Sequence, residues 1–167
     1  MTRAIRDQLR RDDAQHPNVF HQAMVLVQSL EASEDSKNAV DLFLNVYNNG
    51  VEDREKCESY VSGSAYSVVE RFKSGQFRTL IIIGRLLEGF DHANVSVVAI
   101  ARNVQPTSRV MFTQFVGRAL RKATHDDPVK ATVISHVVFK QKANFDAIDT
   151  LAVEEVADED EDLPEEP

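Results

Sequence analysis

Short apolar runs rich in Ile, Val and Leu recur along the chain, separated by longer stretches with helical periodicity. The two clearest runs are Leu80–Ile83 and Val95–Ala101, and their composition is typical of strands buried on both faces of a parallel sheet. Ala23–Val27 and Ala131–Phe139 extend the series, and Cys57–Ser62 is a weaker candidate. The order predicts an α/β fold with a mostly parallel sheet, joined by right-handed crossovers and covered by helices on both faces.

Helices are expected in residues 2–14, 35–47, 65–74, 109–123 and 145–151. The first carries a narrow apolar stripe, Ile5 and Leu9, that either lies on the domain or continues from something upstream. A basic arm that binds nucleic acid is the alternative for this segment. The second helix is expected to bury Val40, Leu42, Phe43 and Val46. Gly75 follows the third helix and predicts a C-cap.

The helix expected at residues 109–123 carries the most informative polar pattern. The preceding Pro-Thr-Ser at 106–108 supplies a start signal, because either hydroxyl can cap the free amides of the first turn. Three polar side chains stack along a stripe beside the apolar face, namely Gln114, Arg118 and Arg121. Gly117 costs about 1 kcal/mol in a helix interior, which is explained if another group approaches the backbone there. A surface helix with two solvated arginines is the alternative.

Two segments resemble motifs of superfamily 2 helicases. Gln114-x-x-Gly117-Arg118-x-x-Arg121 resembles their motif VI, and Glu88-Gly89-Phe90-Asp91 resembles the end of motif V. Residues 94–100 resemble the strand between them, and the order and separation match the second RecA-like domain of these motors. The resemblance covers about residues 20–140. It is closest to restriction-enzyme motor subunits, RadD-like helicases and the excision-repair protein UvrB, which makes DNA repair one expected setting.

The resemblance implies a RecA-like three-layer sandwich that completes an ATP site formed with another domain. By the family pattern Arg121 reaches the γ-phosphate, and Arg118 is its partner on the same phosphates. The implied nucleotide-binding positions are Gly89, Asp91, Gln114 and Gly117. Of these, Gln114 would position water or nucleotide, and Asp91 would lie near the ribose. Because ligands of such sheets bind beyond the carboxyl ends of the strands, we expect the Gly89–Asp91 loop at that edge.

Nucleotide binding by this chain alone is not expected. A phosphate loop needs GxxxxGK[ST] after a strand; Gly84 and Gly89 have the spacing, but Phe90-Asp91 stands where Lys and Ser or Thr are required. No expected strand ends in an Asp–Glu pair suited to magnesium, and no GxGxxG follows a strand as in dinucleotide enzymes. We therefore expect ATP and Mg²⁺ to be shared with a missing N-terminal RecA-like domain. The chain would be the carboxyl half of a helicase, present as a fragment or an isoform and inactive alone, with no metal-ligating residue of its own.

DNA or RNA is the expected partner, although one motif position departs from the family. Motif V usually begins with a threonine that touches the nucleic-acid backbone, and Ile83 occupies that position. The contact is therefore lost or supplied by Arg85. Further candidates are Arg102, Lys73 and Ser29, the last at the strand end that matches motif IV. An ordinary surface or strand-end role is the alternative for each.

The net charge of −8 belongs to the C-terminus rather than to the body of the chain. Residues 152–167 contain nine Asp or Glu and no Lys or Arg, so the remainder has 18 acidic and 19 basic residues. The acidic balance therefore does not argue against nucleic-acid binding by the body. We expect the tail to be disordered, either as a solubilising end or as an autoinhibitory mimic of nucleic acid.

Cysteine content and hydropathy indicate the cellular compartment in which the protein is expected. Cys57 is the single cysteine, so no disulfide framework is expected, and an intracellular location, cytoplasmic or nuclear, is indicated. No apolar run is long enough for a membrane span.

We divide the chain into an N-terminal helix or linker from an upstream domain (1–18), a RecA-like domain (19–151) and an acidic tail (152–167). The leading hypothesis is the second motor domain of an ATP-dependent helicase or translocase. The alternative is a non-catalytic RecA-like module for protein interaction or regulation.

Overall fold

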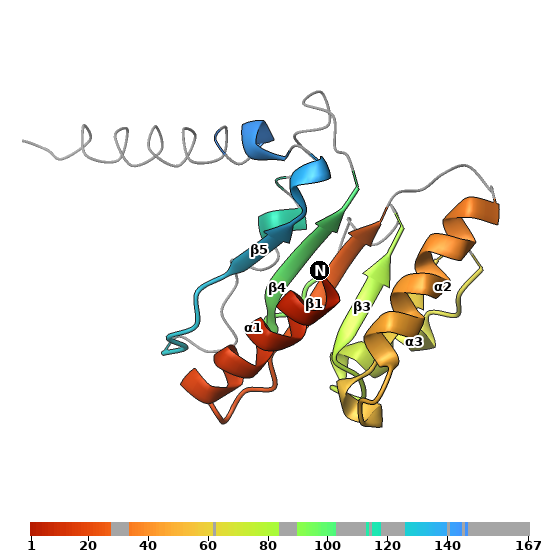
Figure 1. The fold of residues 1–167 in the computed structure, drawn as a ribbon. Coiled ribbons are helices and arrows are strands. Elements are labelled where there is room, and N and C mark those ends of the chain that lie inside the picture. Colours follow the sequence, from red (N-terminus) through yellow and green to blue (C-terminus); the bar gives the residue numbers. More distant parts are fainter. Residues whose placement is uncertain are drawn as a thin grey trace, which may run out of the picture.

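A computed structural model describes residues 1–27, 34–61, 63–83, 90–102, 113, 115–117, 126–139, 141–144 and 146, the side chains of 34–39 excepted. Within these residues five strands form one sheet in the order β2-β3-β1-β4-β5 (Figure 1), and every neighbouring pair is parallel. The strands are β1 (Gln22–Val27), β2 (Cys57–Tyr60), β3 (Thr79–Ile82), β4 (Val95–Ala101) and β5 (Thr132–Ser135). The helices are α1 (Thr2–Gln15), α2 (Glu34–Asn48) and α3 (Ser67–Lys73), and 3₁₀ turns lie at Asp53–Glu55 and Val137–Phe139. The predicted α/β class with a parallel sheet is confirmed.

Strand β1 occupies the centre of the sheet, and all six of its residues are buried. The register places Met24 beside Leu80 of β3 and Val98 of β4, so a row of apolar side chains crosses three strands. A strand with neighbours on both sides and helices over both faces exposes no side chain to water, which explains its nearly continuous apolar sequence.

Alternate residues of the strands point into two separate cores, one on each face of the sheet. On the first face Leu9 of α1 and Tyr47 of α2 pack against Val25 and its neighbours; α1 lies across β1 and β4 in Figure 1. On the second face Phe72 of α3 and Phe115 pack against Met24 and Leu26. The molecule therefore has the helix–sheet–helix layering expected of a three-layer sandwich.

Helix α1 belongs to the first core. Ile5 and Leu9 are 0% and 1% exposed, and the next turn is held by a buried carboxylate. Asp12 accepts hydrogen bonds from Ser96 Oγ at 2.6 Å and from Gln8 Nε2 at 2.7 Å. The apolar stripe of this helix therefore packs on the domain, which is one of the two arrangements expected from the sequence. No helix within the described ranges is both long and apolar enough to cross a membrane.

The end of α3 follows the sequence signal closely. Gly75 has a φ of 72°, a conformation that costs glycine little because it has no Cβ. Its N–H donates to Phe72 O at 2.9 Å, and Gln76 N–H donates to Arg71 O at 3.0 Å. These two bonds form a Schellman cap, so the predicted C-cap is confirmed.

The buried side of α2 differs from the expected one. Leu42 and Val46 are 65% and 50% exposed, whereas Val40 and Tyr47 are buried. Tyr47 turns inward because its hydroxyl can pair there with Thr79 Oγ1 at 2.6 Å, which satisfies the one polar atom of a large apolar side chain.

The last strand is shorter than expected. It ends at Ser135, and the following residues form a 3₁₀ turn in which Val137 and Val138 are 88% and 65% exposed. The apolar run at 137–139 therefore lies outside the strand. Since β5 has β4 as its single neighbour among the described strands, fewer contacts define its end than define the ends of central strands.

Candidate functional site

The connections that follow β1 and β4 run to opposite ends of the strand order, toward β2 and toward β5. After β1 it runs through α2, on the first face, to β2; after β4 it runs through helical residues 115–117, on the second face, to β5. Because β1 and β4 are neighbours, their carboxyl ends flank a topological switch point, where open α/β sheets bind ligands. In the sequence, Ser29 follows β1, and the segment that resembles motif VI lies between β4 and β5.

Arg102 directly follows β4 and lies at this edge. Its carbonyl accepts a hydrogen bond from Gln141 Nε2 at 3.2 Å, which connects it to the segment after β5. Its Nε is buried and donates to no described residue, and burial lowers the pKa of the guanidinium. Among the described residues no carboxylate forms an ion pair with it. A partly buried arginine that pairs with no carboxylate of the described residues is suited to an anionic ligand.

Gly117 belongs to a helical turn with Phe115 and Val116. These two side chains pack in the second core and are 0% and 5% exposed. A Cβ placed on Gly117 would meet no atom within 4 Å among the described residues. Packing within the described part of the chain therefore does not require glycine here. The expected reason for glycine, close approach of another molecule to the helix, stays compatible with this open space.

Asp91 lies away from the carboxyl edge, so the placement expected for it is wrong. The next residue, His92, has its Nε2 2.6 Å from Oε1 of Gln22, the first residue of β1. Asn94 O accepts a hydrogen bond from Gln22 N–H at 2.8 Å. The β3–β4 connection has to return the chain to the start of a parallel strand, and it has reached the amino-terminal edge by Asp91.

Six of the expected site residues lie outside the described residues: Ser29, Arg85, Gly89, Gln114, Arg118 and Arg121. Lys73 is described, and its Nζ lies over the Phe90 ring, 5.1 Å from the centroid. Of the positions chosen from sequence, the structure places Arg102 near the expected ligand edge and Gly117 on a helical turn, residues 115–117, in the segment that resembles motif VI.

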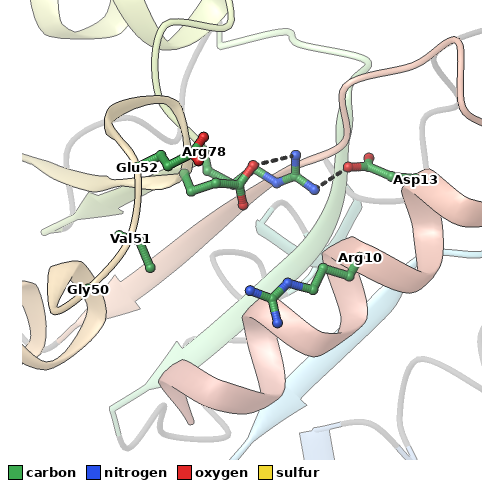
Figure 2. A pocket seen from close by; sticks show the side chains of 7 residues that line it. Arg10, Asp13, Gly50, Val51, Glu52 and Arg78 are labelled. Carbon is green, nitrogen blue, oxygen red and sulfur yellow. Dashed lines mark hydrogen bonds and ion pairs between the residues drawn. The ribbon is translucent and has the colours of Figure 1, made fainter.

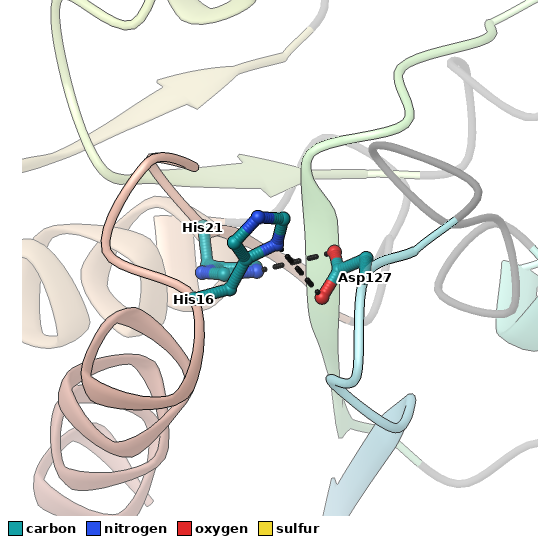
Figure 3. Close-up of side chains that lie close together, drawn as sticks. All are labelled: His16, His21 and Asp127. Carbon is teal, nitrogen blue, oxygen red and sulfur yellow. Dashed lines mark hydrogen bonds and ion pairs between the residues drawn. The ribbon is translucent and has the colours of Figure 1, made fainter.

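A second polar cluster lies at the opposite, amino-terminal edge, and the sequence analysis did not identify it. His16 follows α1, His21 precedes β1, and Asp127 lies before β5 (Figure 3). His16 Nδ1 lies 3.3 Å from Asp127 Oδ1, and His21 Nε2 lies 3.4 Å from Asp127 Oδ2. His16 and Asp127 each precede a proline in the sequence, and 106 positions separate His21 from Asp127, so no local pattern connects them.

Two further groups fix the geometry of this cluster. Asp13 Oδ1 lies 3.1 Å from His21 Nδ1 and accepts the His21 backbone N–H at 3.1 Å. Val129 N–H donates to Asp127 Oδ1 at 2.9 Å. Burial alone would raise the pKa of Asp127, but the Val129 N–H and the adjacent His21 and His16 side chains lower that pKa below its usual value.

Asp13 also borders a pocket of about 380 Å³ between α1 and the α2–β2 connection (Figure 2). The lining residues are Arg10, Asp13, Gly50, Val51, Glu52, Glu55 and Arg78. Arg78 is 2% exposed and pairs with Asp13 and with Glu55, whose Oε1 lies 3.3 Å from Nη1. Three carboxylates face two guanidiniums, so the pocket does not favour an anion. These ion pairs hold α1 against the rest of the domain.

Comparison with known proteins finds likeness in structure rather than in sequence. No protein-family model matches the chain, and no curated protein matches its sequence. Among solved structures, Mss116p DEAD-box helicase domain 2 bound to an RNA duplex has a TM-score of 0.55 and 14% identity, covering 80% of this chain and 46% of that one.

Two further structures have the same kind of fold. S. cerevisiae Dbp5 L327V bound to RNA and ADP BeF3 gives a TM-score of 0.54 and 13% identity, over 80% of this chain and 31% of that one. The Pyrococcus furiosus Hef helicase domain gives 0.50 and 19%, over 80% of this chain and 24% of that one. The chain thus spans less than half the length of each, and it has the RecA-like α/β fold of helicase domains.

Proposed function

We propose that this chain is the second motor domain of an ATP-dependent DNA or RNA helicase or translocase. One observation carries the proposal: the segment with the QxxGRxxR pattern lies in the connection between β4 and β5, and β4 lies beside β1 at the switch point of a RecA-like sheet. Ligands of such sheets bind at that point. The fold and the motif, obtained independently, therefore indicate the same edge.

The chemistry proposed for this edge is stabilisation of a phosphoryl-transfer transition state. A correctly placed arginine is worth about 10³–10⁵ in rate in such reactions, because its planar guanidinium stays charged and can bind two phosphate oxygens at once. We assign this role to Arg121 and Arg118, with Gln114 positioning water or nucleotide. ATP and Mg²⁺ would be held mainly by a first RecA-like domain, since no phosphate loop occurs in this sequence.

Two described residues support the proposal. Gly117 has open space on a helical turn that does not need glycine for its own packing. Arg102 directly follows β4, and its guanidinium has no acidic partner among the described residues. The first favours close approach of a nucleotide or a domain to the helix, and the second favours contact with a phosphate of nucleic acid. The structural neighbours named with bound RNA agree with nucleic acid as the partner class.

The decisive experiment joins the purified chain with a phosphate-loop domain, either encoded upstream or supplied as a separate chain. We expect ATP turnover that single-stranded DNA or RNA stimulates, and loss of that stimulated turnover in Arg121→Ala. Arg3→Ala is the matched control, because Arg3 is 90% exposed on α1 and pairs only with Asp7 among the described residues. Equal turnover by Arg121→Ala and the control would refute the assignment, and so would arginine-dependent turnover by the chain alone.

A non-catalytic interaction module is the second candidate, and the exposed side of α2 favours it. Leu42 and Val46 lie one helical turn apart and are 65% and 50% exposed. An interaction module would keep its partner affinity in Arg121→Ala and show no stimulated ATPase with any phosphate-loop domain. The same set of measurements therefore separates the two candidates.

A further inference from the structure

The cluster of His16, His21 and Asp127 lies at the edge of the sheet opposite the proposed ATP site and has no part in that function. Its three side chains come from the end of α1, the start of β1 and the approach to β5. One ligand atom from each lies within 4.8 Å of the other two. His21 and Asp127 are 1% and 4% exposed, and His16 is 20% exposed, so solvent reaches one side of the cluster.

Hydrogen bonding among these groups leaves part of the cluster unexplained. A neutral imidazole carries one N–H, and His21 Nδ1 faces Asp13 Oδ1 at 3.1 Å. If that nitrogen donates, the lone pair of His21 Nε2 points at the Asp127 carboxylate 3.4 Å away. His16 Nδ1 is buried and makes no well-directed hydrogen bond, although Asp127 Oδ1 is 3.3 Å from it. Two imidazole nitrogens therefore face the two oxygens of one carboxylate.

The distances match those between ligands of a bound metal. Zinc binds imidazole nitrogen and carboxylate oxygen at about 2.0–2.2 Å, so neighbouring ligand atoms in a tetrahedral site are about 3.3–3.5 Å apart. The two N···O separations, 3.3 and 3.4 Å, fall in this range. Such separations are long for hydrogen bonds to a carboxylate, which are usually about 2.7–2.9 Å.

The surroundings of His21 also match a metal site. Histidines that bind metals usually donate their second N–H to a carboxylate or carbonyl, which fixes the tautomer and the ring orientation. Asp13 is placed to do this, and it is itself held by the His21 backbone N–H and by Arg78. The second ring nitrogen of His21, Nε2, then faces Asp127.

We propose that His16 Nδ1, His21 Nε2 and the Asp127 carboxylate bind one divalent transition-metal ion, Zn²⁺ in preference to the harder Mg²⁺ or Ca²⁺. Imidazole ligands select for this class of metal, and a water on the exposed His16 side completes the coordination. The ion would connect the end of α1 and the start of β1 to the segment before β5, and so stabilise the N-terminal helix on the domain. Its role is structural.

The test uses the full chain, freed of metal with a chelator, and Co²⁺ as a spectroscopic probe. We expect one Co²⁺ per chain with a visible d–d band, displacement by Zn²⁺, and a higher thermal unfolding midpoint with Zn²⁺ than without it. Mg²⁺ should neither displace the cobalt nor raise the midpoint. An absent d–d band, or more than one equivalent bound without preference over Mg²⁺, would overturn the proposal.

Point variants distinguish metal binding at this cluster from metal binding by the acidic tail, because every variant retains the tail. His16→Gln should weaken Co²⁺ binding at least tenfold, and Asp13→Asn should weaken it by about 10–100-fold as expected for a group that orients a ligand. His136→Gln is the matched control, because His136 is an exposed histidine outside the cluster. His16 is partly exposed, so its variant is expected to fold even if Asp127→Asn does not. Equal binding by His16→Gln and His136→Gln would refute the site.

Discussion

At the scale of single residues, replacing Gly117 is expected to affect helix stability and function in opposite ways. The position is helical, and a Cβ would meet nothing within 4 Å among the described residues. Gly117→Ala is therefore expected to raise the free energy of unfolding by up to about 1 kcal/mol, because alanine has the higher helix propensity. The same variant should lower the nucleic-acid-stimulated ATPase, measured with a phosphate-loop domain present.

Gly50→Ala is the control for this prediction. Gly50 also has no atom within 4 Å of an added Cβ, but its φ is 69°, a region that alanine adopts only with strain. Its replacement should destabilise the domain in urea titrations. If Gly117→Ala also destabilised the domain, the open space at the helix would have to be occupied by part of the chain itself.

His92 predicts a specific dependence of stability on pH. Burial, followed by the charge of Lys73, lowers the pKa of His92 from 6.5 to about 4, and Asp91 opposes this shift. Its Nε2–H donates to Gln22 Oε1, because Gln22 Nε2 already donates to Phe72 O and Phe77 O. Between these two pH values the unfolded chain binds a proton at His92 that the folded chain does not. The contribution of His92 to stability is therefore complete above about pH 6.5 and falls as the pH approaches 4.

Urea unfolding at pH 7, 5.5 and 4.5 measures this effect. His92→Gln retains a donor for Gln22 but has no titrating group, so its stability should fall less than that of the unaltered chain across this range. The comparison is between the two chains at each pH, because carboxylates titrate in both. A difference in free energy that did not change with pH would contradict the predicted shift.

At the scale of elements, α1 is predicted to contribute to the stability of the domain. Leu9 is 1% exposed in the core formed by α1, α2 and the sheet. Leu9→Ala should reduce the free energy of unfolding by about 2–5 kcal/mol, since it removes buried methyl groups and leaves a cavity. Leu42→Ala on α2 is the matched control, and because Leu42 is 65% exposed its cost should stay within about 0.5 kcal/mol. Denaturant titration of both variants checks this, and equal costs would show that α1 does not pack as described.

At the scale of the whole molecule, charge is divided between a nearly neutral body and an acidic end. The nine acidic residues of 152–167 account for the net charge of −8. If the tail mimics nucleic acid, truncation after Leu151 should strengthen binding of single-stranded nucleic acid at low salt. The gain should shrink as salt is raised, because contacts to phosphates are strongly screened.

A chain with a Gly/Ser tail of equal length is the control for this prediction. It removes the charge and keeps the length, so it should bind as tightly as the truncated chain. Fluorescence anisotropy with a labelled single strand at several salt concentrations gives the three affinities. Equal affinity for all three chains would mean that the tail only solubilises the protein.

The sequence by itself determined the positions of the strands, the α/β class and the end of α3. Each of these follows from local composition: Val95–Ala101 is apolar except for Ser96 because both faces are covered, and Gly75 permits the positive φ of a helix cap. The motif VI pattern also came from the sequence, but Arg118 and Arg121 lie outside the described residues. Their role therefore stays a prediction.

Only the tertiary structure decided the order of the strands and the contacts between distant segments. It put β4 beside β1, returned Asp91 to the amino-terminal edge and turned Tyr47 rather than Val46 inward, where Thr79 satisfies its hydroxyl. It also brought Asp127 to His16 and His21. Residue periodicity reports which side of an element is apolar, whereas these results depend on which other element meets that side. That choice is made by the folded chain as a whole.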